Sequence, residues 1–219
     1  MDHHGEFWSK LAASYDSVID RQLGGRTRWL LRERIAREGA LGRAVEFGCG
    51  TGFFTPALAA KAERLLATDV SEGMLEVAKQ QVQAPNVTFG VEDCQRTSFR
   101  DASVDTAFMA LVIQFTDPPV TLAEMHRILE PGGTLIIGNL DPFALPPPAR
   151  LRCLARVLYH GIAGYRLKPP KSFGRNVLTK DQLGDLLAAA GFRVDTAEAV
   201  HDTSRASNLP VEYVRATCI

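Results

Sequence analysis

The chain has 219 residues, of which 46% are hydrophobic, and its 25 Lys and Arg residues balance 25 Asp and Glu residues. This length suits one domain with an elaboration, and a balanced charge without a basic-aromatic module argues against nucleic acid as a partner. No apolar run approaches the roughly 20 residues that a membrane-spanning helix requires.

Hydrophobic period and turn residues predict helices and strands that alternate along the chain. In chain order we expect helices at 6–20 and 27–38, strands at 43–47 and 65–69, a helix at 71–82, strands at 86–91 and 104–113, a helix at 118–129, a strand at 133–140, helices at 149–159 and 179–191, and strands at 192–200 and 211–218. Ser71 and Thr179 are the expected N-caps of two of these helices. Strands separated by helices imply parallel pairing with right-handed crossovers, and therefore an α/β fold.

The alternation breaks after Asp141, where prolines bracket a short predicted helix. From Pro142 to Lys180 the chain carries eight basic residues and no acidic one. We interpret this chemically distinct segment as an insertion into the α/β pattern.

The cysteines of the chain are far apart: they are Cys49, Cys94, Cys153 and Cys218, without a CxxC pair. This spacing predicts neither a disulfide framework nor a structural metal site, and it favours a reducing compartment. Residues 1–10 lack an apolar signal core. We therefore expect a cytoplasmic protein that holds no metal.

A glycine-rich turn follows the first predicted strand: AVEFGCGTGFFT, residues 44–55, contains Gly48, Gly50 and Gly52. In an open parallel sheet, ligands bind beyond the carboxyl ends of the strands, where this turn lies. A dinucleotide fingerprint would place its third glycine where this chain has Phe53, so the fit to NAD is imperfect. The turn also lacks the Lys-Ser/Thr pair of a triphosphate-binding loop.

Carboxylates accompany the ends of successive strands, with Glu46 in the first, Asp69 ending the second and Asp93 after the third. A carboxylate offers two acceptor oxygens and a ribose diol offers two donors, so Asp69, about 20 residues beyond the first glycine, suits a ribose. The pattern predicts a ligand that contains a ribose and few or no phosphates.

Five ordered stretches, VEFGCGTG, ATDVSEGMLEVAK, VEDCQRTSF, VDTAFMALVIQF and ILEPGGTLIIGN, resemble the motifs of class I S-adenosylmethionine-dependent methyltransferases over roughly residues 40–140. The likeness is strongest to the small-molecule branch, methyltransferase type 11, which includes ubiquinone and menaquinone biosynthesis enzymes. It implies a Rossmann-like, mostly parallel seven-stranded sheet with helices on both faces and an antiparallel last strand. It also implies one methyltransferase domain over 1–219, with an N-terminal helical cover at 1–38.

The resemblance implies S-adenosylmethionine as cofactor and S-adenosylhomocysteine as product. Glu46 and the glycine turn would face the methionine part, Asp69 the ribose and Asp93 the adenine amino group. Tyr15 would help to close the pocket. The implied cofactor-binding residues are Tyr15, Glu46, Gly48, Cys49, Gly50, Gly52, Asp69, Val70, Met74, Asp93 and Cys94.

Several of these residues also have a purely structural interpretation. Asp69 could cap the helix that follows it, Asp93 could form a turn and Met74 could belong to the core. Glu46 lies inside an apolar strand, where a lone carboxylate is costly to bury, so it requires donors from the ligand or from loop amides.

The implied reaction is an in-line displacement at a sulfonium methyl group, to which an enzyme contributes mainly alignment in a dry site. A thiolate, an amine or an activated carbon needs no dedicated base, whereas a hydroxyl acceptor needs one. Relatives often carry a histidine near Gln114, and its absence here leaves Gln114, Asp141, His160 or no base at all as the candidates for catalysis.

The insertion at 141–178 lies where the resemblance implies a substrate cover. Its apolar and basic character favours either a lid over a small hydrophobic acceptor, with peripheral contact to an anionic membrane, or a solvated cationic face. Protein methylation, a monomer and a homodimer all stay open. Two other functions remain as alternatives: a catalytically silent S-adenosylmethionine-binding module, and a nicotinamide-dependent oxidoreductase, for which no Tyr-x-x-x-Lys pair is present.

Overall fold

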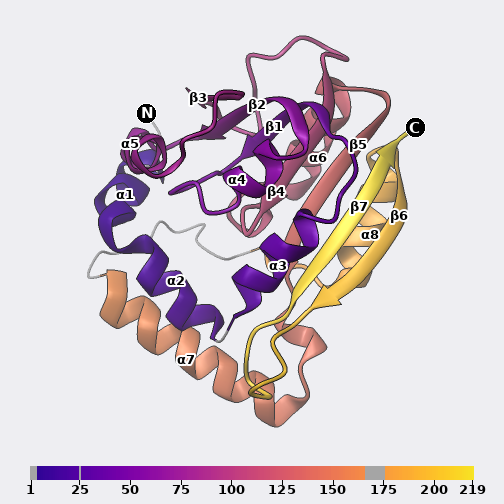
Figure 1. The fold of residues 1–219 in the computed structure, drawn as a ribbon. Helices are drawn as coiled ribbons and strands as arrows, with labels where there is room; N and C mark the ends of the chain where they lie inside the picture. Colours follow the sequence, from indigo (N-terminus) through magenta and orange to yellow (C-terminus); the bar gives the residue numbers. More distant parts are fainter. Residues whose placement is uncertain (1–3, 25, 166–175) are drawn as a thin grey trace.

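A computed structural model describes residues 4–24, 26–165 and 176–219 (Figure 1). Its centre is a seven-stranded sheet with the order β3-β2-β1-β4-β5-β7-β6. The strands are β1 Gly42–Phe47, β2 Ala62–Asp69, β3 Val87–Val91, β4 Val104–Ala110, β5 Leu129–Leu140, β6 Phe192–Val200 and β7 Val211–Cys218. Only β7 runs against its neighbours, β5 and β6. The predicted α/β sheet with an antiparallel last strand is confirmed.

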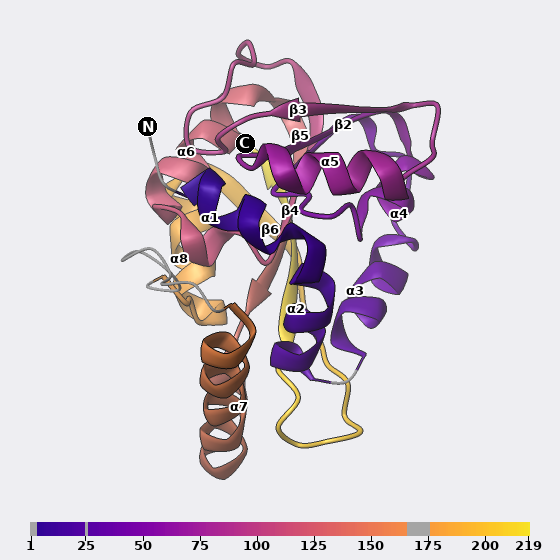
Figure 2. The same ribbon diagram turned by 90° about the vertical axis from the view of Figure 1, so that its left-hand side faces the viewer.

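Helices cover both faces of this sheet (Figure 1, Figure 2). They are α1 His4–Leu11, α2 Tyr15–Leu23, α3 Thr27–Ile35, α4 Thr55–Ala59, α5 Glu72–Gln81, α6 Pro118–Ile128, α7 Pro147–Tyr165 and α8 Lys180–Ala189. Side chains of β1 alternate between the faces, as the period of two requires. Ala44 packs with Leu31 of α3 and Leu58 of α4, whereas Phe47 packs with Leu122 of α6. Each face of the sheet therefore has its own core.

The expected single helix at 6–20 is wrong. The chain forms α1, one turn of 3₁₀-helix at Ala12–Ser14, and then α2. The two helices bury different surfaces: α1 packs Phe7 on Met74 of α5, whereas α2 inserts Ile19 and Leu23 into the core that contains α3. One straight helix cannot reach both surfaces, so the chain bends between them.

The helix expected at 149–159 is longer, because α7 extends from Pro147 to Tyr165 and lies along α2 (Figure 1). Cys153 of α7 joins the core cluster that contains Leu23 of α2. Arg156 donates from Nη2 to the Leu23 carbonyl at 2.8 Å, at the end of α2 where carbonyls lack helical partners. This tertiary packing supports a helix that local sequence period underestimates. Residues 166–175 of the expected lid lie outside the described part of the chain.

Both predicted N-caps are present. Ser71 Oγ accepts a hydrogen bond from Met74 N at the start of α5, and Thr179 and Gln182 form a reciprocal capping box at the start of α8. Strand β5 begins before the predicted turn, at Leu129, and its register against β4 shifts beside Val104. The Pro-Gly-Gly segment is therefore an irregularity inside the strand and not a turn before it.

Candidate functional site

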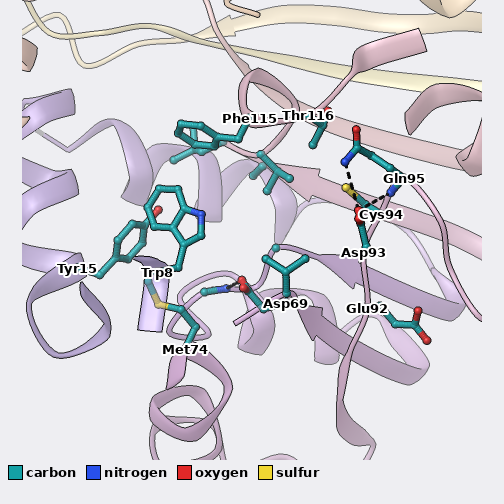
Figure 3. A pocket seen from close by; sticks show the side chains of 16 residues that line it. Trp8, Tyr15, Asp69, Met74, Glu92, Asp93, Cys94, Gln95, Phe115 and Thr116 are labelled. Atoms are coloured by element: carbon teal, nitrogen blue, oxygen red, sulfur yellow. Dashed lines mark hydrogen bonds between the residues drawn. The ribbon is translucent and has the colours of Figure 1, made fainter. Parts of the chain in front are cut away.

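A pocket lies beyond the carboxyl ends of β1, β2 and β4 and holds about 850 Å³ of space, part of which is open to solvent (Figure 3). This is where the sheet order reverses between β1 and β4, the position at which open α/β sheets bind ligands. The lining residues are Trp8, Tyr15, Gly48, Gly50, Asp69, Val70, Met74, Glu92, Asp93, Cys94, Gln95, Ala110, Leu111, Val112, Phe115 and Thr116.

Gly48 and Gly50 of the turn lie in different surroundings, so a side chain would have a different effect at each position. A Cβ added at Gly48, whose φ is +64°, would lie 2.3 Å from Val112 Cγ2, so a side chain there would collide with the loop after β4. A Cβ at Gly50 would meet only Tyr15 Cε1, at 3.7 Å. The backbone at Gly50 therefore leaves open space toward the pocket, in which a ligand could approach the main chain.

Asp69 ends β2 and ties the glycine turn to the start of α5. Its carboxylate accepts hydrogen bonds from Gly50 N and from Ser71 N, each at 2.9 Å. Burial raises the pKa of Asp69 to about 6, while these amide donors act in the opposite direction. Each oxygen can still accept a further hydrogen bond, because a carboxylate oxygen has two lone pairs.

Glu46 does not line the pocket, although its predicted partner was the methionine part of the cofactor. Its side chain shares the face of β1 that carries Ala44, and it accepts a 2.7 Å hydrogen bond from Thr55 Oγ1 of α4. Burial raises its pKa to about 8, and the nearby Asp69 charge adds to the shift. Cys49 and Gly52 also do not line the pocket.

Aromatic side chains from separate segments form one wall of the pocket (Figure 3). Trp8 of α1 makes edge-to-face contacts with Tyr15, at 6.0 Å between ring centroids, and with Phe115, at 5.2 Å. Met74 lies beside this group, at the first turn of α5. Trp8 and Phe115 were not among the residues predicted from the sequence, because Trp8 lies on α1 and Tyr15 on α2, and the three rings meet only in the folded chain.

The loop after β3 forms the opposite side of the pocket (Figure 3). Asp93 Oδ1 accepts a 2.9 Å hydrogen bond from Gln95 N, so this residue does form a turn, and its side chain is exposed. Burial raises the pKa of the Cys94 thiol to about 12, which leaves no thiolate at neutral pH. Glu92 and Gln95, which the sequence analysis did not identify, complete this side.

None of the three candidate catalytic residues lines the pocket. Gln114 is buried and donates to the Leu111 carbonyl at 2.8 Å. Asp141 caps the short helix that follows β5, where it accepts hydrogen bonds from Phe143 N and Ala144 N. His160 lies on α7 with its ring against Tyr159. Gln114 and Asp141 thus make hydrogen bonds within the protein, and none of the three candidates is among the residues that line the pocket.

The residues matched by a known family include the glycine turn and most of this pocket. Residues 45–137 match a family model described as a methyltransferase domain. The matched stretch, 45–137, is a methyltransferase domain, and the comparisons support the class I S-adenosylmethionine-dependent family. This match supports S-adenosylmethionine as the cofactor of the domain.

Two curated relatives are similar to this methyltransferase domain. The biotin biosynthesis bifunctional protein BioHC of Cellvibrio japonicus is 37% identical over 142 residues, which cover 63% of this chain and 27% of the relative. A malonyl-[acyl-carrier protein] O-methyltransferase of Serratia marcescens is 34% identical over 136 residues, which cover 61% of this chain and 51% of the relative. The chain thus spans about half or less of the length of these relatives.

The fold of the methyltransferase also occurs in solved structures. A chain of the complex between the Haloferax volcanii Trm112 methyltransferase activator and a methyltransferase superposes with a TM-score of 0.70. The two chains are 18% identical, and the superposition covers 96% of this chain and 97% of the other. At this identity the likeness shows the shared fold alone.

The charges around the methyltransferase pocket suit a cation. The lining contains Asp69, Glu92 and Asp93, and no Lys, Arg or His is among the lining residues that the structure describes. S-adenosylmethionine is a sulfonium that also carries an amino acid, so negative walls and an approachable backbone at Gly50 fit it. A pyrophosphate would face repulsion here. Within the described residues, no group of three or more His, Cys, Asp or Glu could hold a metal ion.

Proposed function

We propose that the protein transfers the methyl group of S-adenosylmethionine to a small acceptor by in-line displacement. The observation that carries this proposal is the pocket itself, which has three carboxylates and no basic side chain among its described lining residues, next to a glycine turn open at Gly50. When bound, the cofactor supplies an electrophilic methyl group on its sulfonium sulfur.

In this proposal each side of the pocket holds a different part of the cofactor. The remaining lone pairs of Asp69 accept the ribose hydroxyls, and the second oxygen of Asp93 accepts the adenine amino group. The backbone at Gly50 and the Tyr15 ring border the methionine part. Trp8 and Phe115 exclude water from the reacting end, which strengthens electrostatic interactions there.

The acceptor is expected to carry an atom that is nucleophilic without a dedicated base. The support is that Gln114, Asp141 and His160 all lie outside the lining. The Serratia marcescens relative is named as an O-methyltransferase of malonyl-[acyl-carrier protein], and a malonyl carboxylate is ionised at neutral pH. We therefore propose a carboxylate or a thiolate as the first acceptors to test.

A screen with methyl-labelled cofactor tests this function. Carboxylic acids, thiols, phenols, quinols and amines are offered separately, and label is measured in each product. We expect label on a carboxylate or a thiol. Label only on phenols, with a rate that depends on a single titrating base, would contradict the base-free proposal. Binding of S-adenosylhomocysteine without any transfer would favour the silent binding module instead.

We further propose that the segment at 141–178 covers the acceptor. Asn176 donates from Nδ2 to the carbonyl of Thr116, a lining residue, at 2.5 Å. Asn139, at the end of β5, donates to the Leu178 carbonyl at 2.8 Å. These contacts place the end of the insertion, just before α8, along the edge of the pocket, and they support its proposed role as a cover.

Peripheral contact with an anionic membrane is a separate proposal for the same segment. No helix in the described part of the chain is both long enough and apolar enough to span a bilayer. The outer side of α7 nevertheless exposes Leu151, Leu158 and Tyr159, beside the basic Arg152. Co-sedimentation with vesicles tests it: we expect binding to anionic vesicles only, and equal binding to neutral ones, or none to either, would refute it.

Oligomeric state and compartment stay predictions. A monomer and a homodimer are both compatible with the proposed chemistry, and sedimentation of the full chain distinguishes them. The spacing of the cysteines supports our expectation of a cytoplasmic location.

A further inference from the structure

One carboxylate joins the N-terminal helices to the glycine turn. Asp16, in the first turn of α2, accepts a 2.7 Å hydrogen bond from Arg28 Nη2 of α3 at one oxygen. Its other oxygen accepts a 2.9 Å hydrogen bond from Thr51 Oγ1, inside the glycine turn. Asp16 is therefore bound on both sides, although it is separated from Thr51 by a strand and a helix in the sequence.

Arg28 makes further contacts at this junction. Its side chain is only 3% exposed, and it forms a second ion pair with Asp20 at 3.3 Å. Its guanidinium also lies 3.9 Å above the centroid of the Phe53 ring. Arg28 and Asp16 thus fasten α2 and α3 to the turn at two points, Phe53 and Thr51. The ion pairs with Asp16 and Asp20 compensate the cost of burying this guanidinium.

The neighbour of Asp16 is the pocket residue Tyr15. Consecutive residues of an α-helix point about 100° apart, so one side chain can face the pocket while the next contacts the turn. Tyr15 Cε1 lies 3.7 Å from the position of a Cβ at Gly50, and the ring lines the pocket. Any shift of Asp16 would therefore move the ring that borders the open side of Gly50.

We propose that Asp16 is a positioning residue: through Thr51 and Arg28 it holds Tyr15 over Gly50 and so shapes the part of the pocket that receives the methionine end of the cofactor. This inference rests on the proposed function, because the ligand end next to Tyr15 is assigned there.

The test compares two ligands on purified full-length variants by calorimetry. S-adenosylhomocysteine contains the methionine part, and 5′-methylthioadenosine lacks the amino acid. We expect Thr51→Val, which keeps the volume but loses the hydroxyl, and Asp16→Asn to weaken S-adenosylhomocysteine binding about tenfold, the effect of losing one hydrogen bond to a charged group. Binding of 5′-methylthioadenosine should change by less than about threefold, because this ligand lacks the amino acid part that Tyr15 borders.

Two controls separate positioning from general stability. Asp20→Asn loses an ion pair with the same Arg28 but has no contact with Thr51, so its affinity for both ligands should stay near that of the wild type. Thr51→Ser keeps the hydroxyl that Thr51→Val loses, so it should bind S-adenosylhomocysteine as the wild type does. The double variant Asp16→Asn with Thr51→Val should bind no more weakly than the worse single variant, since both changes break the same contact.

Different results would refute the positioning role of Asp16 and the proposed function. Equal weakening of both ligands, the same loss in Asp20→Asn, or additive effects in the double variant would each overturn the positioning role of Asp16. A wild-type protein that does not bind S-adenosylhomocysteine would instead refute the proposed function, and this is measured first. Thermal unfolding of each variant verifies that the compared proteins are folded.

Discussion

Two carboxylates at neighbouring strand ends have different electrostatic environments. Asp69 accepts hydrogen bonds from two backbone amides, which limits its pKa to about 6 despite burial. Glu46 has one hydroxyl donor, Thr55, and its pKa reaches about 8. At pH 7 in the free protein, Asp69 is therefore mostly ionised and Glu46 mostly protonated. Of these two carboxylates, Asp69 is the one that offers its negative charge to a ligand in the pocket.

Protonation of Glu46 predicts a pH-dependent stability. The ordinary value is 4.5 and the value in the folded protein is about 8, so between these values the folded state binds more protons than the unfolded state. The contribution of Glu46 to stability is fully present below pH 4.5 and falls as the pH rises toward 8, by at most about 1.4 kcal/mol per pH unit for one proton. Asp69 adds to this decline between about pH 4 and 6.

The substitution Glu46→Gln tests this assignment, because glutamine resembles the protonated carboxyl and can still accept from Thr55. Urea unfolding of the wild type between pH 6 and 8 should show the decline, and the variant should be nearly flat. Parallel slopes in the two proteins would mean that Glu46 is already ionised when folded.

Residue identity was easier to predict than side-chain direction. The acids at the strand ends were apparent from the sequence, and Asp69 and Asp93 do line the pocket. Glu46 does not, because the alternation of β1 directs it toward Thr55 on a helix whose place depends on the whole fold. Trp8 and Phe115 carry no local motif, since they meet only when α1 packs over the loop after β4.

At the level of elements, α1 is docked by a close approach to α5. A Cβ added at Gly73 would lie 2.8 Å from Ser9 Cβ and 2.9 Å from Ser9 Cα. Ser9 Oγ also accepts a hydrogen bond from Gly73 N at 3.2 Å and pairs with Ser71 Oγ at 2.8 Å. The missing side chain at Gly73 therefore allows α1 to place Trp8 beside the pocket.

The substitution Gly73→Ala is expected to displace α1 and to weaken S-adenosylhomocysteine binding about tenfold, although alanine is the better helix former. Gly184→Ala is the matched control, since a Cβ there meets nothing within 4 Å in the middle of α8. The control should stabilise the protein by about 0.5 to 1 kcal/mol and leave binding unchanged. Calorimetry and urea unfolding measure both effects. Unchanged binding in Gly73→Ala would show that α1 does not shape the site.

Elements with local signals were predictable, and those set by packing were not. Caps at Ser71 and Thr179 marked the starts of α5 and α8 because a side chain satisfies the first amides of its own helix. The break between α1 and α2 and the length of α7 arise from contacts with distant segments. Local period contains no information about those contacts.

At the scale of the molecule, the sheet order sets the position of the pocket, and the charge of the pocket determines which ligand it binds. Ligand binding to the folded state alone raises stability by mass action, about 2.7 kcal/mol at a hundredfold excess over Kd. S-adenosylhomocysteine should therefore raise the Tm by about 5 to 10 °C, given a sensitivity of about 2 to 4 °C per kcal/mol for a chain of this size. NADH, whose pyrophosphate meets Asp69, Glu92 and Asp93, should leave the Tm unchanged. A larger shift with NADH would favour the oxidoreductase alternative.

The overall architecture followed from the sequence because alternating strands and helices allow few topologies. The antiparallel β7 was an implication of the family resemblance, and the structure confirms it. The acceptor was not predictable, since no motif marks the side of the pocket that would receive it.

A crystal structure of the full chain with S-adenosylhomocysteine tests the central claim most directly. We predict the adenosyl group in the pocket between β1 and β4, both ribose hydroxyls on Asp69, and the amino acid part beside Gly50 under the Tyr15 ring. A complex with the ligand elsewhere on the molecule, or with the Asp69 carboxylate making no contact with the ribose, would contradict the account.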